Sequence, residues 1–337
     1  MSSCLLDYLA AHNKELPPIG GEYPFSEFDA AVFSWLVYFP LVYVPEAQTG
    51  GGDESIALKD YCEMTLSACR NPRSTPPPPS FKNGNDSFTF EKYSMDEYKK
   101  ELIFLEHIKD SPRYRDVRLE RSRAVNDSLD SNRSPLDCAQ FGAVTFVILP
   151  YKDGDEKIRV ITFRGTNMTF VGWRDNLYFA LDNYTPRVKI LAVDYVSGVI
   201  EQCPDSRFVI TGHSKGGHLA VYGFYMFVYN KWYERRSEIH FDTKGHRERI
   251  MASFYKMKGG KSVLNFDGPG IKESEKKSLR DSRRMIIHSK NMKKWLLCTL
   301  PLQQFFPFCW EETTMRRFLM FRVMNSVFTN IHSVLGL

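Results

Sequence analysis

The chain has 337 residues, of which 43% are hydrophobic, and it carries a formal net charge of +5 at pH 7. This length allows one large domain or two modest ones, and the hydrophobic fraction is sufficient for a sizeable core. The positive charge is mild and spread along the chain, and no apolar run is long enough to span a bilayer, so we expect neither a nucleic-acid partner nor a transmembrane segment.

The N-terminal residues carry no recognisable export signal. The apolar stretch from Cys4 to Ala11 is too short for a signal peptide, and it contains Asp7. The seven cysteines are an odd number without paired spacing, which fits reduced thiols and provides no zinc site. We therefore expect a cytoplasmic protein, although the sequence is also compatible with export by a route that leaves no such signal.

Residues 1–45 are expected to form a helical segment that packs on the core. Ser26, Glu27 and Asp29 precede a strongly apolar stretch, and this order is typical of a helix start. Basic residues are missing from the stretch, so a buried helix is favoured over a helix that lies on a membrane surface.

Residues 46–135 are interpreted as an insertion or cap that is partly irregular. They include a Gly-rich loop at 48–55 and a proline-rich run at 72–80, which must be extended or irregular. Residues 96–123 mix basic and acidic side chains and are expected to form one or two exposed helices. The arginines of this stretch invite a nucleic-acid interpretation, but the acidic residues among them favour a solvated helix face.

Residues 136–282 are expected to form the core, an α/β domain. Apolar runs predict four strands, and a helical pattern separates the second from the third. The strands are expected at 140–149, 157–163, 207–211 and 262–266, with a helix, or a strand followed by a helix, within 184–199 and a short helix after 170–176. Strands that alternate with helices predict a mostly parallel central sheet with flanking helices.

The third predicted strand runs into Gly212-His213-Ser214-Lys215-Gly216, and an amphipathic helical pattern follows. Strand, G-x-S-x-G and helix form the pattern of a nucleophile elbow, in which the flanking glycines prevent a steric collision at a sharp turn. The serine oxygen then points away from the sheet, at the positive end of the next helix. A glycine-rich turn with an incidental serine is the alternative.

The residues that follow the strands predict a catalytic site. We assign Ser214 as the nucleophile, which needs a neighbouring base, and Asp267 as the acid that orients this base. The backbone N–H of Lys215 and the residue Thr166 are the expected donors to the oxyanion. Thr166 is equally compatible with a helix cap, and Asp267 with an Asp-Gly turn. We expect no metal and no organic cofactor.

Four segments of the chain resemble the class 3 lipase-like α/β-hydrolases, and in particular a bacterial branch of uncharacterised function. They are Phe163-Arg164-Gly165-Thr166, Gly172-Trp173, Gly212–His218 and Asn265-Phe266-Asp267-Gly268-Pro269-Gly270. The resemblance covers residues 136–270 well and 24–45 loosely. It implies the α/β-hydrolase fold, a Ser-acid-His triad in that chain order, and an oxyanion donor from the loop at 163–166.

The resemblance does not identify the triad histidine. His213 and His218 flank the serine and are expected to point away from the elbow. After Asp267 the sequence contains His288 and His332, and the spacing of His332 is plausible for a triad.

Residues 283–337 depart from the family pattern, and one hypothesis is a frameshift near 283–293. Codons that can encode Met324–Ile331, read two bases further on, permit a segment that resembles the family's histidine region. The same frame over Cys309–Thr314 permits another family-like segment. Under this hypothesis the catalytic base is missing from the chain.

The sequence thus favours a serine hydrolase that cleaves the acyl ester of a lipid or a small molecule through an acyl-enzyme. Two other classes stay open. One is an impaired hydrolase fold that is used for binding, which the unassigned histidine favours. The other is a surface-acting effector or toxin whose residues 46–135 bind a partner or lipid. The sequence does not indicate an oligomeric state.

Overall fold

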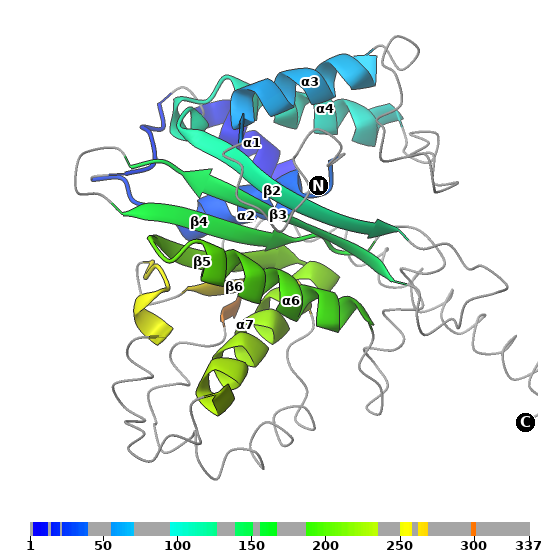
Figure 1. Cartoon of the computed structure of the whole chain (residues 1–337). Coiled ribbons are helices and arrows are strands. Elements are labelled where there is room, and N and C mark those ends of the chain that lie inside the picture. The colour runs from blue at the N-terminus through cyan, green and yellow to red at the C-terminus, as the bar shows by residue number, and fades with distance from the viewer. Residues whose placement is uncertain are drawn as a thin grey trace, which may run out of the picture.

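The chain folds into a sheet with helices on both faces, as a computed structural model shows (Figure 1). This arrangement confirms the α/β class. The described residues are 3–12, 15–20, 22–39, 55–70, 95–126, 139–150, 156–166, 187–234, 250–257, 262–268 and 298–300. The helix expected after 170–176 lies outside these ranges.

The described strands form one seven-stranded sheet in which spatial order follows chain order. The three pairings from β1 to β4 are antiparallel, and the three from β4 to β7 are parallel. A mostly parallel sheet is therefore not confirmed, because the pairings divide equally. The strands are β1 (Ile56–Ala57), β2 (Val117–Asn126), β3 (Gln140–Ile148), β4 (Lys157–Phe163), β5 (Ser206–His213), β6 (Val263–Phe266) and β7 (Cys298–Leu300).

The four strands predicted from apolar runs are all confirmed, as β3 to β6. They are apolar on both faces because helices cover both faces of the sheet. In β4, for example, Val160 belongs to the core on one side and Ile161 to the core on the other. Successive side chains of a strand point to opposite faces, so each strand contributes to two cores.

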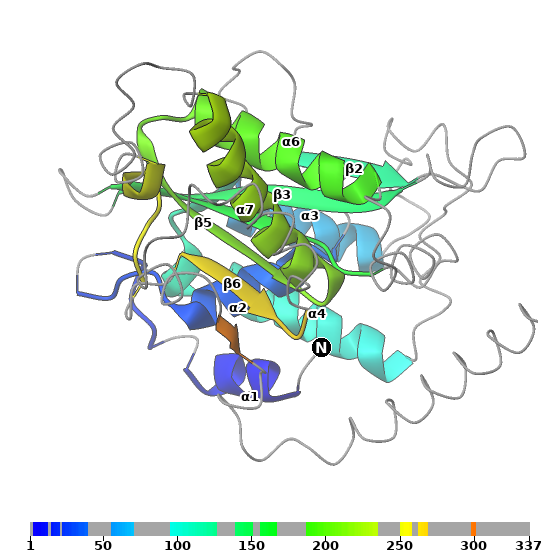
Figure 2. The same cartoon turned by 90° about the horizontal axis from the view of Figure 1, so that it is seen from below.

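Helices α1 to α4 pack on one face of the sheet, and α6 and α7 pack on the other (Figures 1 and 2). Their bounds are α1 (Ser3–His12), α2 (Glu27–Leu36), α3 (Leu58–Arg70), α4 (Met95–Lys109), α6 (Arg187–Gln202) and α7 (Lys215–Glu234). The predicted start of α2 is confirmed, since Ser26 and Asp29 form a capping box there. The helix predicted within 184–199 is confirmed as α6.

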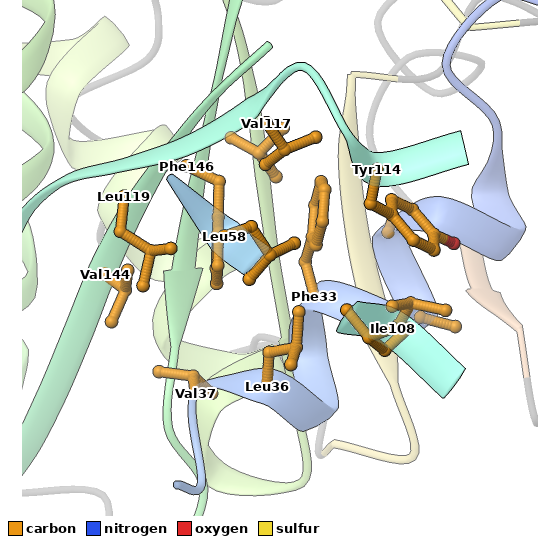
Figure 3. Packing of buried hydrophobic residues seen from close by; sticks show 14 of the residues in the cluster. Phe33, Leu36, Val37, Leu58, Ile108, Tyr114, Val117, Leu119, Val144 and Phe146 are labelled. Atoms are coloured by element: carbon orange, nitrogen blue, oxygen red, sulfur yellow. The ribbon is translucent and has the colours of Figure 1, made fainter. Parts of the chain in front are cut away.

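Phe33 of α2 lies at the centre of the first core (Figure 3). Its ring stacks on Phe146 of β3 with a centroid distance of 4.6 Å and an interplanar angle of 9°. Leu58 and Val117 lie close to it, from α3 and β2 (Figure 3). Burying one such aromatic side chain contributes about 1.5–3 kcal/mol, so α2 is anchored on the sheet rather than merely adjacent to it.

The expectation of exposed helices over 96–123 is only half right. The first part forms α4, which buries Phe104 and Leu105. A short 3-10 turn at Pro112–Tyr114 then leads into β2, a strand of the central sheet. Val117 and Leu119 alternate with charged residues, which is the period of a strand and not of a helix.

The expected solvated face of arginines is also wrong for Arg113, which is only 6% exposed. Its guanidinium binds both carboxylate oxygens of the buried Asp29, at 2.9 Å from Nε to Oδ1 and 2.7 Å from Nη2 to Oδ2. The remaining N–H groups donate to the backbone carbonyls of Pro17, Tyr23 and Pro24. This bidentate pair joins the start of α2 to the turn before β2.

The buried pair affects the protonation of Arg113 and of the neighbouring Tyr114. Burial alone would lower the pKa of Arg113, but the hydrogen bonds and the charge of Asp29 outweigh it and raise that pKa. Tyr114 donates to Asp29 Oδ1 at 3.2 Å. Burial first, and then the Asp29 charge, raise the pKa of the Tyr114 phenol well above its ordinary value. The phenol therefore stays a neutral donor.

Candidate active site

Three of the four family-like motifs meet in one row across the sheet, and the fourth, Gly172-Trp173, lies outside the described residues. Phe163 of β4 is paired with Gly212 of β5, and Gly212 is paired with Asn265 of β6. These strands are parallel, so the residues that follow them emerge at the same edge of the sheet. Segments about 50 residues apart in sequence are thereby brought side by side.

Ser214 lies at the bend between β5 and α7. Its φ of 56° is in the left-handed region that residues with a Cβ rarely adopt. Its N–H donates to the carbonyl of Phe266 at 2.8 Å, which ties the bend to the end of β6. The predicted strand, bend and helix are therefore confirmed. The side chain is partly exposed.

Close packing explains the glycines at 212 and 216. A Cβ on Gly212 would lie less than 3.0 Å from the backbone of Gly216. A Cβ on Gly216 would lie equally close to the carbonyl of Phe163, at the end of β4. Only glycine permits both approaches, because neither neighbour is a flexible side-chain end.

Asp267 occupies the matching position after β6. Its φ is 55°, and among the described non-glycine residues only Ser214 and Asp267 have a positive φ. The side chain of Asn265 fixes this turn, because Nδ2 donates to the Gly268 carbonyl at 3.1 Å and Oδ1 accepts from the Gly268 N–H at 2.9 Å. The Asp267 side chain is 41% exposed. Its role as the acid stays a prediction.

The loop that carries Thr166 lies beside the bend. The N–H of Arg164 donates to the Gly142 carbonyl at 2.8 Å, which holds the loop against β3. A Cβ on Gly165 would lie 2.8 Å from the carbonyl of His213, so the loop touches the residue before Ser214. Thr166 follows, half-buried. This placement is compatible with the predicted oxyanion role and does not test it.

Lys215 is the first residue of α7, so its backbone N–H belongs to the helix end that has no acceptor within the helix. The side chain has a separate function that the sequence did not indicate. It is buried, and Nζ donates to the carbonyl of Gln140 at the start of β3, at 2.9 Å. The ammonium group thus binds the backbone of β3.

His213 is the residue that sequence reasoning missed. It was expected to point away from the elbow, but Nε2 lies 3.9 Å from Asp267 Oδ2. Nδ1 lies 3.0 Å from the hydroxyl of Tyr38, and the ring stacks on Trp35 at a centroid distance of 4.8 Å. Burial lowers the pKa of His213 from 6.5 to about 4, so the imidazole is neutral at pH 7.

Besides His213, the described ranges contain His12, His107 and His218. His218 is buried within α7 and stacks on Tyr222. His12 lies at the end of α1. His288 and His332, which the chain order of a triad favours, lie outside the described ranges. Most of residues 283–337, to which the frameshift hypothesis applies, also lie outside them. From that segment, residues 298–300 form β7 beside β6.

No group of three or more His, Cys, Asp and Glu side chains among the described residues is arranged to hold a metal ion. None of the helices within these ranges combines the length and the apolar character that crossing a bilayer requires.

A serine on a strained strand-to-helix bend, in an α/β protein, with Gly-rich turns on either side, is the arrangement of a lipase-like hydrolase. The chain belongs to the Mbeg1-like family, whose model matches residues 108–286. This family is related to class 3 lipase-like proteins. A search of curated proteins gave no match.

Proposed function

We propose that the protein is a serine hydrolase of the α/β-hydrolase fold that cleaves an acyl ester. The observation that carries the proposal is the backbone of Ser214, held at a φ of 56° between β5 and the first turn of α7. A serine held in this strained conformation between a strand and a helix has the geometry of a nucleophile elbow.

The chemistry proceeds in two steps. Ser214 Oγ attacks the acyl carbonyl carbon while a base takes its proton, and the alcohol then leaves with that proton as the acyl-enzyme forms. Water attacks the acyl-enzyme in the second step, releases the acid and restores the serine. The Lys215 N–H and Thr166 stabilise the oxyanion in each step, and losing one such donor costs about 3 kcal/mol of barrier.

Asp267 orients the base in this proposal. The family's chain order places the base after Asp267, where His288 and His332 follow in the sequence. The substrate is the ester of a small molecule or a lipid, acted on in the cytoplasm, and no cofactor takes part. The register of β4, β5 and β6 supports this proposal, since it brings the segments that carry Thr166, Ser214 and Asp267 to one edge of the sheet.

The test is labelling of the full chain with a fluorophosphonate, together with hydrolysis of short p-nitrophenyl esters. Ser214→Ala is expected to abolish labelling and to lower kcat/KM by about 10³-fold or more. Ser67→Ala, which changes an exposed serine of α3, is the matched control and should behave as the parent. Parental esterase rates in Ser214→Ala would contradict the assignment.

A binding protein with an impaired hydrolase fold is the second candidate. The observation that favours it is His213, the histidine next to the serine, whose Nδ1 faces the Tyr38 hydroxyl and whose Nε2 faces Asp267. A full chain that neither reacts with the fluorophosphonate nor hydrolyses esters, yet is folded, would support this candidate over the enzyme.

A further inference from the structure

His213 connects three parts of the molecule that are distant in sequence. Trp35 and Tyr38 belong to the end of α2 and the turn after it, and Asp267 follows β6. The imidazole ring of His213 stacks on Trp35 with an interplanar angle of 27°, which fixes the plane of the imidazole. Nδ1 faces Tyr38, and Nε2 faces Asp267. The imidazole therefore lies between a fixed hydroxyl and the predicted catalytic carboxylate.

We propose that His213 is a positioning residue that orients the Asp267 carboxylate, and that the Tyr38 hydroxyl selects the tautomer of His213 that does so. The proposal rests on the function proposed above for Asp267. It adds α2 to the site, although α2 precedes the family match at 108–286.

The tautomer follows from the groups that face the two ring nitrogens. The Tyr38 hydroxyl, 3.0 Å from Nδ1, can donate to Nδ1 or accept from it, whereas the ionised carboxylate on the Nε2 side can only accept. The carboxylate therefore favours the proton on Nε2, and the Tyr38 hydroxyl, which then donates to Nδ1, stabilises that tautomer. That N–H faces Asp267. The other tautomer would turn a lone pair toward the carboxylate, which is repulsive.

Gly165 makes the approach of Tyr38 possible. A Cβ at this position would collide with the Tyr38 hydroxyl, and it would also crowd the carbonyl of His213. The loop that carries Thr166 thus leaves room for the hydroxyl, and Tyr38 contacts both the bend and this loop. One side chain from the turn after α2 therefore lies against two turns of the site.

In this proposal His213 contacts Asp267 through a neutral N–H donor and does not form an ion pair. Burial lowers the pKa of His213 to about 4, so its ring stays uncharged through neutral pH. The separation of 3.9 Å is longer than a hydrogen bond, but the carboxylate is 41% exposed and can rotate toward Nε2. Hydrogen bonds at catalytic groups are often long before substrate binds.

The first test is ¹⁵N NMR of the full chain with labelled histidine, with the His213 signals assigned by their loss in His213→Gln. We expect the Nε2-protonated tautomer between about pH 6 and 8. Tyr38→Phe should turn this into a mixture of tautomers, whereas Tyr23→Phe, a change at an exposed tyrosine, should not. The Nδ1-protonated form in the parent, or an unchanged tautomer in Tyr38→Phe, would overturn the proposal.

The second test compares His213→Gln with His213→Asn. A glutamine amide nitrogen reaches the place of Nε2, and an asparagine amide reaches the place of Nδ1. We expect His213→Asn to lower kcat by about tenfold or more at similar KM, the factor that one hydrogen bond to a charged group provides, and His213→Gln to restore most of it. Equal losses in both variants would overturn the proposal.

The two tests separate the possible failures. The NMR result does not depend on turnover, so it decides the tautomer even in a chain that does not react with fluorophosphonate. An inactive parent with the Nε2 tautomer would refute the proposed function and keep the arrangement of Tyr38 and His213. An active parent with the Nδ1 tautomer would refute only the inference drawn from His213.

Discussion

The antiparallel and parallel halves of the sheet differ in where their strands end, and the predicted site residues all follow strands of the parallel half. In the half from β1 to β4, neighbouring strands end at opposite edges, so their termini do not collect at one place. In the half from β4 to β7, the strands end at the same edge. Thr166, Ser214 and Asp267 all follow strands of the parallel half, and the paired ends of β4 to β6 bring their turns together.

The antiparallel half contributes stability instead. Its turn before β2 carries Arg113, which is bound to Asp29 of α2 in a fully buried pair. The pair holds α2 on the sheet, and the end of α2 delivers Trp35 and Tyr38 to the site. The two halves should therefore respond differently to mutation. Changes at the pair should act on folding, and changes at the row of turns should act on reactivity.

The largest expected effect on stability is that of Asp29→Ala. Removal of this carboxylate leaves a buried guanidinium without its partner, which costs about 3–5 kcal/mol of unfolding free energy. Urea unfolding followed by circular dichroism measures it. Asp110→Ala, which removes the exposed Lys109–Asp110 pair at 3.6 Å, is the control and should cost less than about 1 kcal/mol. Similar losses in both would show that the buried pair has no special role.

An intermediate effect is expected from Gly216→Ala. The new methyl group meets the Phe163 carbonyl, and relief of this clash must shift the bend, at a cost of about 1–3 kcal/mol. Fluorophosphonate labelling of Ser214 should fall together with stability. Gly198→Ala is the matched control, because nothing lies within 4 Å of its added Cβ on α6. It should stabilise the protein by about 0.5–1 kcal/mol and leave labelling unchanged.

The smallest expected effect is the contribution of His213 to the unfolding free energy, and it changes only at acidic pH. The unfolded chain takes up a proton on His213 below its ordinary pKa of 6.5, whereas the folded protein does so near pH 4. Between these values the unfolded state binds more protons, so unfolding free energy falls as pH falls, by at most about 1.4 kcal/mol per pH unit.

His213→Gln should remove that part of the pH dependence, and urea unfolding at about pH 7 and about pH 5 measures the difference. His12→Gln, which changes an exposed histidine, is the control variant. A parent and a His213→Gln variant that lose stability in parallel would mean that His213 protonates in the fold as easily as in the unfolded chain.

The bend at Ser214 and the start of α2 were predictable because their signals are local. Glycine spacing next to an apolar strand defines the first, and the capping pair Ser26 and Asp29 defines the second. Strand β2 was missed for two reasons. A register shift between Leu119 and Arg121 interrupts its alternation, and its charged Glu120 is satisfied by Arg159, far along the chain.

The contact between His213 and Asp267 could not be read from the sequence. It depends on how β5 and β6 pair and on where α2 crosses the sheet, and none of these is encoded within a short window. The sequence predicted that the motifs at Phe163, Gly212 and Asn265 lie at one edge of the sheet, since functional groups collect after parallel strands. It did not predict which residues of the three strands are paired.

The stacking of Phe33 on Phe146 has a practical consequence for recombinant work on this chain. A fragment trimmed to the family match at 108–286 would lack α2 and would open the apolar sheet surface that Phe33 shields. Such a surface favours aggregation. Expression boundaries for crystallisation or screening should therefore begin upstream of Phe33, even though the family pattern starts some 70 residues later.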